Sequence, residues 1–147
     1  MNLLSDLGVW GAGFHKSIDR TFGPAVREEL ADRYKQRGMP LGTVWLHRVA
    51  PDTRLATFVA VRGLRSPFCD TPLDYPSLRL AMERLIEVLP REGVEFHGPR
   101  LGKSPQNADW SIVSKIIEEV IVSRGFEVTI YDLKENTHVV GSAGRHL

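Results

Sequence analysis

The chain has 147 residues, of which 42% are hydrophobic and 25% charged, and its formal net charge is +1. This composition is that of one soluble globular domain with a core of its own, and the balanced charges give no sign of a nucleic-acid-binding coat. A single cysteine excludes an internal disulfide, and the absence of a long apolar run or a signal pattern predicts a cytoplasmic protein without a membrane partner.

The first feature along the chain is a glycine-rich segment, residues 8–13. The seven residues before it are too few for a full strand and turn. After it, Phe14, Ile18 and Phe22 recur at helical spacing, which predicts a helix. Glycines ahead of a helix N-terminus let backbone amides approach an anion, so phosphate is the expected guest. A turn that needs glycine only for packing is the alternative.

The following residues predict a helix and a hairpin. Pro24 suits the first helical position, and the apolar pattern continues to Gly38. Residues 42–49 and 55–61 read as two strands joined by a turn at Pro51 and Asp52.

Helices and strands alternate through the second half. The elements expected there are a surface loop at 62–75, a helix at 76–89, a strand at 94–97, an irregular loop at 98–108, a helix capped by Asp109, and a strand at 127–131. The expected apolar face of the second helix consists of Ile112, Val113, Ile116, Ile117, Val120 and Ile121. This alternation predicts an α/β sandwich with a parallel or mixed central sheet, whose ligand-binding loops lie beyond the carboxyl ends of the strands.

The segment 98–104 resembles a phosphate-binding P-loop, but three residues separate its glycines where four are required. We therefore do not expect a nucleotide triphosphatase. The loop can still hold a phosphate through the amides of Gly102 and Ser104, with Lys103 adding positive charge. No histidine lies at ligand spacing from another metal-binding residue, so neither a metal nor a cofactor is predicted. His97 is expected at a strand end facing the loops, where the alternatives are a structural role and a role in the site.

Taken together, these segments resemble the macro domain, the family that binds ADP-ribose and often removes it from proteins or nucleic acid. The resemblance extends from about residue 5 to residue 133. It is strongest in the segments 5–14, 40–44, 99–110, 115–119 and 128–133. The subgroup that it resembles most contains the terminal ADP-ribose protein glycohydrolase and the DNA-ADP-ribose-removing antitoxins.

The resemblance implies a three-layer α/β/α sandwich with a mixed central sheet at 1–133. The residues after it, 134–147, read as a tail in which Thr137–Val140 is an optional edge strand. The first loop would wrap the diphosphate and distal ribose, and the second, at 101–107, would hold the phosphates from the other side. Ser5 would lie against the distal ribose. The loop that begins at Arg62 would border the reactive end of the sugar.

Three departures from the family pattern bear on activity. The family's first strand, with its adenine-binding aspartate, would lie upstream of residue 1, which leaves a sheet edge for another segment or a protein partner. In the second loop, Lys103 and Ser104 replace small residues, and Gln106 stands where the glycohydrolase has its catalytic acid. Arg62 falls near the catalytic lysine, and a guanidinium that stays protonated cannot act as a nucleophile.

Three functions follow from these observations. The first is a domain that binds ADP-ribose or a related nucleotide diphosphate, or an ADP-ribosylated macromolecule, with weak or absent hydrolase activity. Its expected ligand-binding residues are Gly11, Ala12, Gly13, Phe14, Gly102, Ser104 and Gln106. The second is a catalytically dead macro fold that serves as a structural or interaction module. The third is a working ADP-ribosyl hydrolase whose catalytic residues are Ser5, Asp6 and Lys103.

Overall fold

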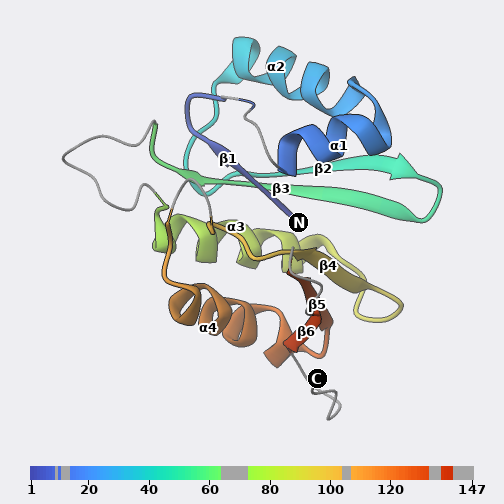
Figure 1. The fold of residues 1–147 in the computed structure, drawn as a ribbon, viewed down its shortest axis with the longest axis vertical. Helices are drawn as coiled ribbons and strands as arrows, with labels where there is room; N and C mark the ends of the chain where they lie inside the picture. The colour runs from blue at the N-terminus through green and yellow to red at the C-terminus, as the bar shows by residue number, and fades with distance from the viewer. Residues whose placement is uncertain (9, 11–13, 64–72, 104–106, 133–136, 141–147) are drawn as a thin grey trace.

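Helices and strands follow one another along the chain in the computed structural model, which describes residues 1–8, 10, 14–63, 73–103, 107–132 and 137–140 (Figure 1). In chain order the elements are β1 (Asn2–Ser5), α1 (Phe14–Phe22), α2 (Ala25–Arg37), β2 (Val44–Ala50), β3 (Thr53–Val61), α3 (Tyr75–Val88), β4 (Glu95–Pro99), α4 (Trp110–Val120), the 3-10 turn η1 (Val122–Arg124), β5 (Glu127–Tyr131) and β6 (Thr137–Val140). Among the described helices, none is long and apolar enough to cross a membrane.

The strands form a mixed sheet, as predicted. β1 runs parallel to β3, which pairs on its other side with antiparallel β2. β4 runs parallel to β5, which pairs on its other side with antiparallel β6. The two ladders meet where the Met1 ammonium donates to the carbonyl of His97, at 2.9 Å. Pro99 in β4 has no N–H with which to continue this pairing, which explains why the sheet divides here.

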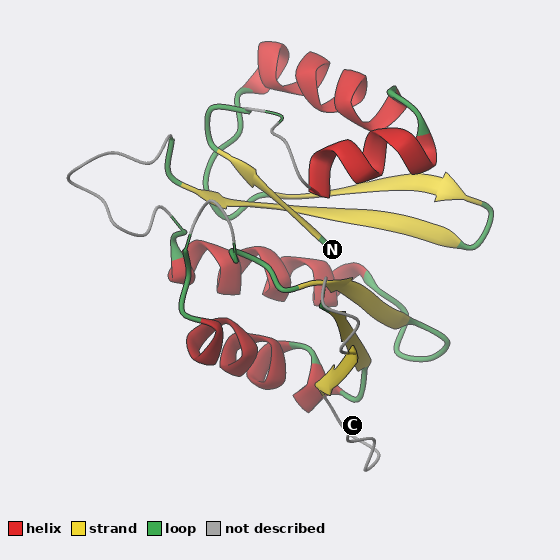
Figure 2. Cartoon of the chain, viewed as in Figure 1, coloured by secondary structure: helices red, strands yellow, loops and turns green. Residues whose placement is uncertain are grey.

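Two helical layers enclose the sheet (Figure 2). α1 and α2 lie on one side of β1, β2 and β3, and α3 and α4 lie on the other side. Each layer has its own apolar core. The core beneath α1 and α2 is built around Leu4, Ile18, Val26, Leu30, Met39, Leu55 and Val59. The larger core on the side of α3 and α4 includes Leu3, Phe58, Leu78, Met82, Leu85, Val113, Ile117, Val128 and Ile130. The predicted three-layer α/β/α sandwich is therefore confirmed.

The expectation that residues 1–7 are too few for a strand was wrong. β1 forms there because it pairs with β3, in the register Asn2 opposite Thr57 and Leu3 opposite Phe58. Adjacent side chains of a strand point to opposite faces. Leu3 accordingly enters the larger core and Leu4 the smaller one. The strand therefore owes its stability to burial on both faces, which its length does not reveal.

The remaining elements follow the predictions closely. Asp109 caps α4, since its carboxylate accepts a hydrogen bond from the Ser111 amide at 2.9 Å. Ile112 was wrongly assigned to the apolar face, because it is 40% exposed. It lies one residue, or about 100° of helix rotation, before the buried stripe that begins at Val113. Thr137–Val140 does form an edge strand, which covers the outer side of β5.

Candidate functional site

The loops after the parallel strands meet at one end of the sheet, which is the carboxyl end of β1, β3 and β4. Asp6, directly after β1, joins the end of β3 at two points. Its amide donates to the Val61 carbonyl at 2.9 Å, and its Oδ1 accepts from the Gly63 amide at 2.6 Å. The preceding residue, Ser5, is 7% exposed. The predicted Ser5 and Asp6 pair is thus held against the start of the long loop.

An ion pair joins the two ends of that long loop. Nε of Arg62 lies 3.0 Å from Oδ1 of Asp74, and the Asp74 amide donates to the Ala60 carbonyl at 2.7 Å. Leu73 forms an isolated antiparallel bridge with Val61. The loop therefore leaves β3 and returns to it at the same place. Residues 64–72 lie outside the described part of the chain.

Asp74 also caps α3. Its carboxylate accepts hydrogen bonds from the amide and the hydroxyl of Ser77. Partial burial raises the pKa of Asp74, but the hydrogen bonds from Ser77 and Arg62 outweigh it, so the pKa lies below its usual value. Asp74 is therefore a carboxylate at neutral pH, and it holds Arg62 beside the Asp6 turn.

The second loop depends on Gly102. Its φ is +80°, and a Cβ built there would lie 2.8 Å from Cβ of Ala108 and 2.9 Å from Cδ2 of Leu73. The Gly102 carbonyl accepts from the Ala108 amide at 2.8 Å, which closes the turn. Contact with Leu73 brings this loop next to the end of β3. Ser104 and Gln106, both predicted to bind ligand, lie outside the described residues.

Two cations share one carboxylate beside the second loop. Nζ of Lys103 lies 3.2 Å from Oδ1 of Asp132, and Nε of Arg100 lies 3.5 Å from its Oδ2. The Arg100 guanidinium also lies over the ring of Trp110, 5.3 Å from its centroid. This arrangement leaves a surplus of positive charge at the loop, which favours an anion. No ion pair joins Lys103 to Asp6 within the described residues, so the structure does not bring these two predicted catalytic residues into contact.

Helix α1 begins at Phe14, as expected, and Gly11, Ala12 and Gly13 lie outside the described residues. Phe14 opens the helix and is 41% exposed. Trp10 stacks on His15 with ring centroids 4.1 Å apart, and its indole donates to Asp19 at 3.1 Å. Trp10 also packs on the smaller core. Its structural role is therefore that of an anchor that fixes the segment to α1.

His97 does not lie at a strand end, contrary to the prediction. It lies in the middle of β4, where Nδ1 is 2.8 Å from the hydroxyl of Tyr131 and Nε2 is 3.3 Å from Glu95. Its ring therefore lies between Glu95, the first residue of β4, and Tyr131, the last residue of β5. In the described part of the chain, no group of three metal-binding side chains occurs.

Sequence reasoning did not single out Asp74 and Asp132. Each carboxylate acts through a partner that is distant in the sequence, and neither lies in a recognisable motif. Asp74 had one signal in the sequence, because it lies two residues before the predicted helix start at Pro76 and is a residue type that caps helices. Asp132 is one residue beyond a predicted strand, at the end where ligands usually bind.

Comparison with solved structures identifies the fold. A macrodomain protein from Streptomyces coelicolor is 28% identical to this chain, covers 89% of it and 84% of its own length, and superposes with a TM-score of 0.71. This chain has the macrodomain fold. No protein-family model matches the sequence, and no curated protein matches it either.

Two further structures extend the comparison. A protein of unknown function from Bacteroides thetaiotaomicron is 24% identical over 90% of this macrodomain and 85% of its own chain, with a TM-score of 0.82. Thermosipho africanus DarTG, solved in complex with ADP-ribose, is 21% identical over 92% of this macrodomain and 39% of its own chain, with a TM-score of 0.68. At these identities the likeness concerns the fold.

We predict that Gly102→Ala destabilises the protein more than Gly93→Ala. Both glycines have positive φ, +80° and +77°, so both substitutions incur backbone strain of about 1–2 kcal/mol. A Cβ at residue 93 meets nothing within 4 Å, whereas one at residue 102 meets Ala108 and Leu73. Overpacking adds about 1–3 kcal/mol at residue 102. Urea unfolding of both variants measures the difference in their free energies of unfolding. Equal losses of stability would contradict the close packing of Gly102 against Ala108 and Leu73.

We predict that Asp74→Asn lowers stability at neutral pH but not in acid. Asparagine still caps a helix, so this variant removes mainly the charge, at a cost of about 0.5–1 kcal/mol. Because the folded pKa of Asp74 lies below its ordinary value, the wild-type advantage is present above about pH 4 and is lost as the pH falls through the folded pKa. Thermal melts from pH 7 to pH 2 test this. Asp74→Ala is the control that also removes the helix cap. If Asp74→Asn were as destabilised at pH 2 as at pH 7, the result would contradict this account.

Proposed function

We propose that this macrodomain binds ADP-ribose, or a related nucleotide diphosphate, at the carboxyl ends of its parallel strands. The observation on which the proposal rests is the convergence of two glycine-dependent loops with charge at one end of the sheet. The Asp6 turn is joined to Gly63, and the Gly102 loop is joined through Leu73 to the same end of β3. The solved DarTG complex with ADP-ribose has this fold and supports the choice of ligand.

The diphosphate would lie between residues 11–14 and residues 102–104. On the first side, the segment 11–13 leads into the N-terminus of α1, where backbone amides and the helix dipole favour phosphate. On the second side, Lys103 and Arg100 share a single carboxylate and so retain positive charge for a second anion. Ser5 and Asp6 would border the distal ribose. Gln106 would complete the second loop as a neutral hydrogen-bonding group.

Hydrolysis by this domain would be weak or absent. Arg62 occupies the region of the subgroup's catalytic lysine, and its guanidinium is held by Asp74 at 3.0 Å. Such a group stays protonated and cannot attack the sugar. Lys103 likewise forms an ion pair with Asp132, and the Asp6 carboxylate accepts a hydrogen bond from the Gly63 amide. Both side chains that would act as nucleophile or base are therefore already engaged.

The second candidate is an interaction module without a ligand. It is favoured by the same observation, because each charged side chain that would serve catalysis already has a partner within the protein. The protein partner would pair with an edge of the sheet. β6 covers the outer side of β5, so a partner in that region would add to β6.

We predict that ADP-ribose binds with a Kd of about 1 μM, equivalent to roughly −8 kcal/mol. Gly13→Glu should abolish binding, because its carboxylate would stand where the diphosphate is expected. Gly93→Glu is the matched control, since it makes the same chemical change at the far end of the sheet. Calorimetric titration of the wild-type chain and the two variants with ADP-ribose, each shown to be folded, tests this prediction. An absence of heat from the intact wild-type chain would overturn the ligand-binding proposal and leave the interaction module.

We predict no release of ADP-ribose from a modified protein or DNA above the rate without enzyme. The reason is the engagement of Arg62, Lys103 and Asp6 described above. Chromatographic detection of free ADP-ribose over several hours measures it. Release by the wild-type chain that is lost in Asp6→Ala would instead establish the working hydrolase with Asp6 as a catalytic residue.

A further inference from the structure

Two cations near the second loop reach toward the end of β5. Nζ of Lys103 lies 3.2 Å from Oδ1 of Asp132, and Nε of Arg100 lies 3.5 Å from Oδ2 of the same carboxylate. Asp132 directly follows Tyr131, the last residue of β5, and its side chain is 11% exposed. The positive charge is therefore centred beyond the end of β5, one strand away from β4, which leads into the turn at Gly102.

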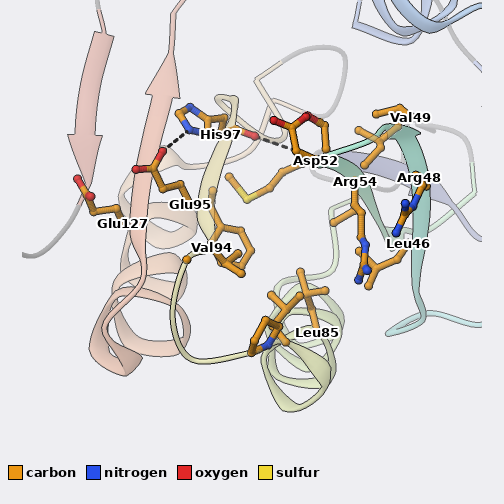
Figure 3. A pocket seen from close by; sticks show the side chains of 18 of the residues that line it. Leu46, Arg48, Val49, Asp52, Arg54, Leu85, Val94, Glu95, His97 and Glu127 are labelled. Atoms are coloured by element: carbon orange, nitrogen blue, oxygen red, sulfur yellow. Dashed lines mark hydrogen bonds and ion pairs between the residues drawn. The ribbon is translucent and has the colours of Figure 1, made fainter.

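The order of the strands relates this charge to Asp6. β4 lies beside β1, because the Met1 amine donates to the His97 carbonyl of β4 (Figure 3). β5 lies on the other side of β4 and runs parallel to it. Neighbouring strands are about 4.8 Å apart, so Asp132 after β5 is two strand spacings, or about 10 Å, from Asp6 after β1. The loop between them follows β4 and contains the Gly102 turn.

This spacing determines which part of a bound nucleotide reaches Asp132. In the proposed binding mode, the distal ribose borders Asp6, and the diphosphate lies against the amides of the loop that follows β4. The second ribose, which carries the base, is joined to the other end of the diphosphate and so comes to the end of β5. The assignment of this nucleoside end rests on the proposed function and concerns the same site.

The charge at the nucleoside end is not balanced within the described part of the chain. Arg100 and Lys103 carry two positive charges, and Asp132 offers one negative charge to both. The carboxylate of Asp109 accepts hydrogen bonds from the amide and hydroxyl of Ser111 instead, and so caps α4. The Lys103 side chain is 48% exposed, so a ligand can reach it. A surplus of positive charge that a ligand can reach suits a phosphate.

Trp110 holds the second cation in position. The Arg100 guanidinium lies over its ring, 5.3 Å from the centroid, and the Arg100 side chain is 31% exposed. A guanidinium held in this way presents a fixed fork of N–H donors, which matches the oxygens of a phosphate. An arginine near the nucleoside ribose is also how dinucleotide-binding folds accommodate a 2′-phosphate. Both cations have more donors than one carboxylate can engage.

We propose that this site binds a nucleotide with an additional phosphate monoester on the ribose of its nucleoside, and that Lys103 and Arg100 bind this phosphate. The ligand class is the 2′- or 3′-phosphate of ADP-ribose. Asp132 keeps the two cations together at the end of β5, and the remaining donors of both bind the phosphate oxygens. The backbone amides of the glycine-dependent loops hold the diphosphate, as in the unmodified ligand.

Calorimetric titration of this chain at pH 7.5 compares ADP-ribose with its 2′-phosphate and its 3′-phosphate. We expect one of the two phosphates to bind about tenfold more tightly than ADP-ribose, because it adds charge-assisted hydrogen bonds to Lys103 and Arg100. This preference should be smaller at pH 5, since a phosphate monoester takes up its second proton at about pH 6. Equal affinities for the three ligands at pH 7.5 would overturn the proposal.

Two variants test the assignment of the cation. Lys103→Met should remove most of the preference for the phosphorylated ligand. Lys115→Met is the matched control, because it makes the same change at a side chain that is 73% exposed and lies 3.9 Å from Glu119 instead of Asp132. Any effect of Lys103 on the diphosphate changes both affinities alike and cancels in their ratio. A ratio that Lys103→Met leaves unchanged, or that Lys115→Met lowers equally, would overturn the assignment.

These measurements also distinguish this proposal from ADP-ribose binding itself. If ADP-ribose binds and neither phosphate binds more tightly, the phosphate site is wrong and the proposed function stands. If only a phosphorylated ligand binds, the phosphate site is supported and the additional phosphate is required for binding. If none of the three binds to the folded chain, both proposals are overturned.

Discussion

Parallel pairing between β1 and β3 is the interaction on which the rest of the structure depends. It inserts a four-residue strand between the hairpin and β4, with Leu3 in one core and Leu4 in the other. It also places the Asp6 turn against Gly63, where the loops after β1 and β3 meet. On its other side, β1 meets the second ladder through the hydrogen bond from the Met1 amine to the His97 carbonyl.

Charge at the carboxyl end of the sheet is arranged in two separate groups, one ion pair and one carboxylate shared by two cations. Asp74 holds Arg62, and Asp132 holds Lys103 together with Arg100. The Arg62–Asp74 ion pair joins the two ends of the long loop, and Asp74 also caps α3. The second group leaves positive charge beside Gly102. Both groups hold cations in place, where they can attract an anion, which suits binding more than proton transfer or nucleophilic attack.

The sequence predicted most elements because their signals were local: helical spacing in α1, the Asp109 cap, and the turn between β2 and β3. Its errors had non-local causes. β1 required a partner 55 residues away, as the pair Asn2 and Thr57 shows. His97 was misplaced because a strand pattern does not reveal how far a residue lies from the strand's end. For the site, sequence resemblance supplied the loops, whereas the carboxylates Asp74 and Asp132 became visible only through their tertiary contacts.

The most direct test of this account is an amide chemical-shift map of the protein titrated with ADP-ribose. The account predicts changes at Asp6, Gly63, Gly102 and Lys103, which lie at the carboxyl end of the sheet, and none at Arg54 or Gly93 at the other end. That result would show that the two loops form one nucleotide site. Changes confined to the end of the sheet with Arg54 and Gly93, or no changes at all in the folded protein, would contradict it.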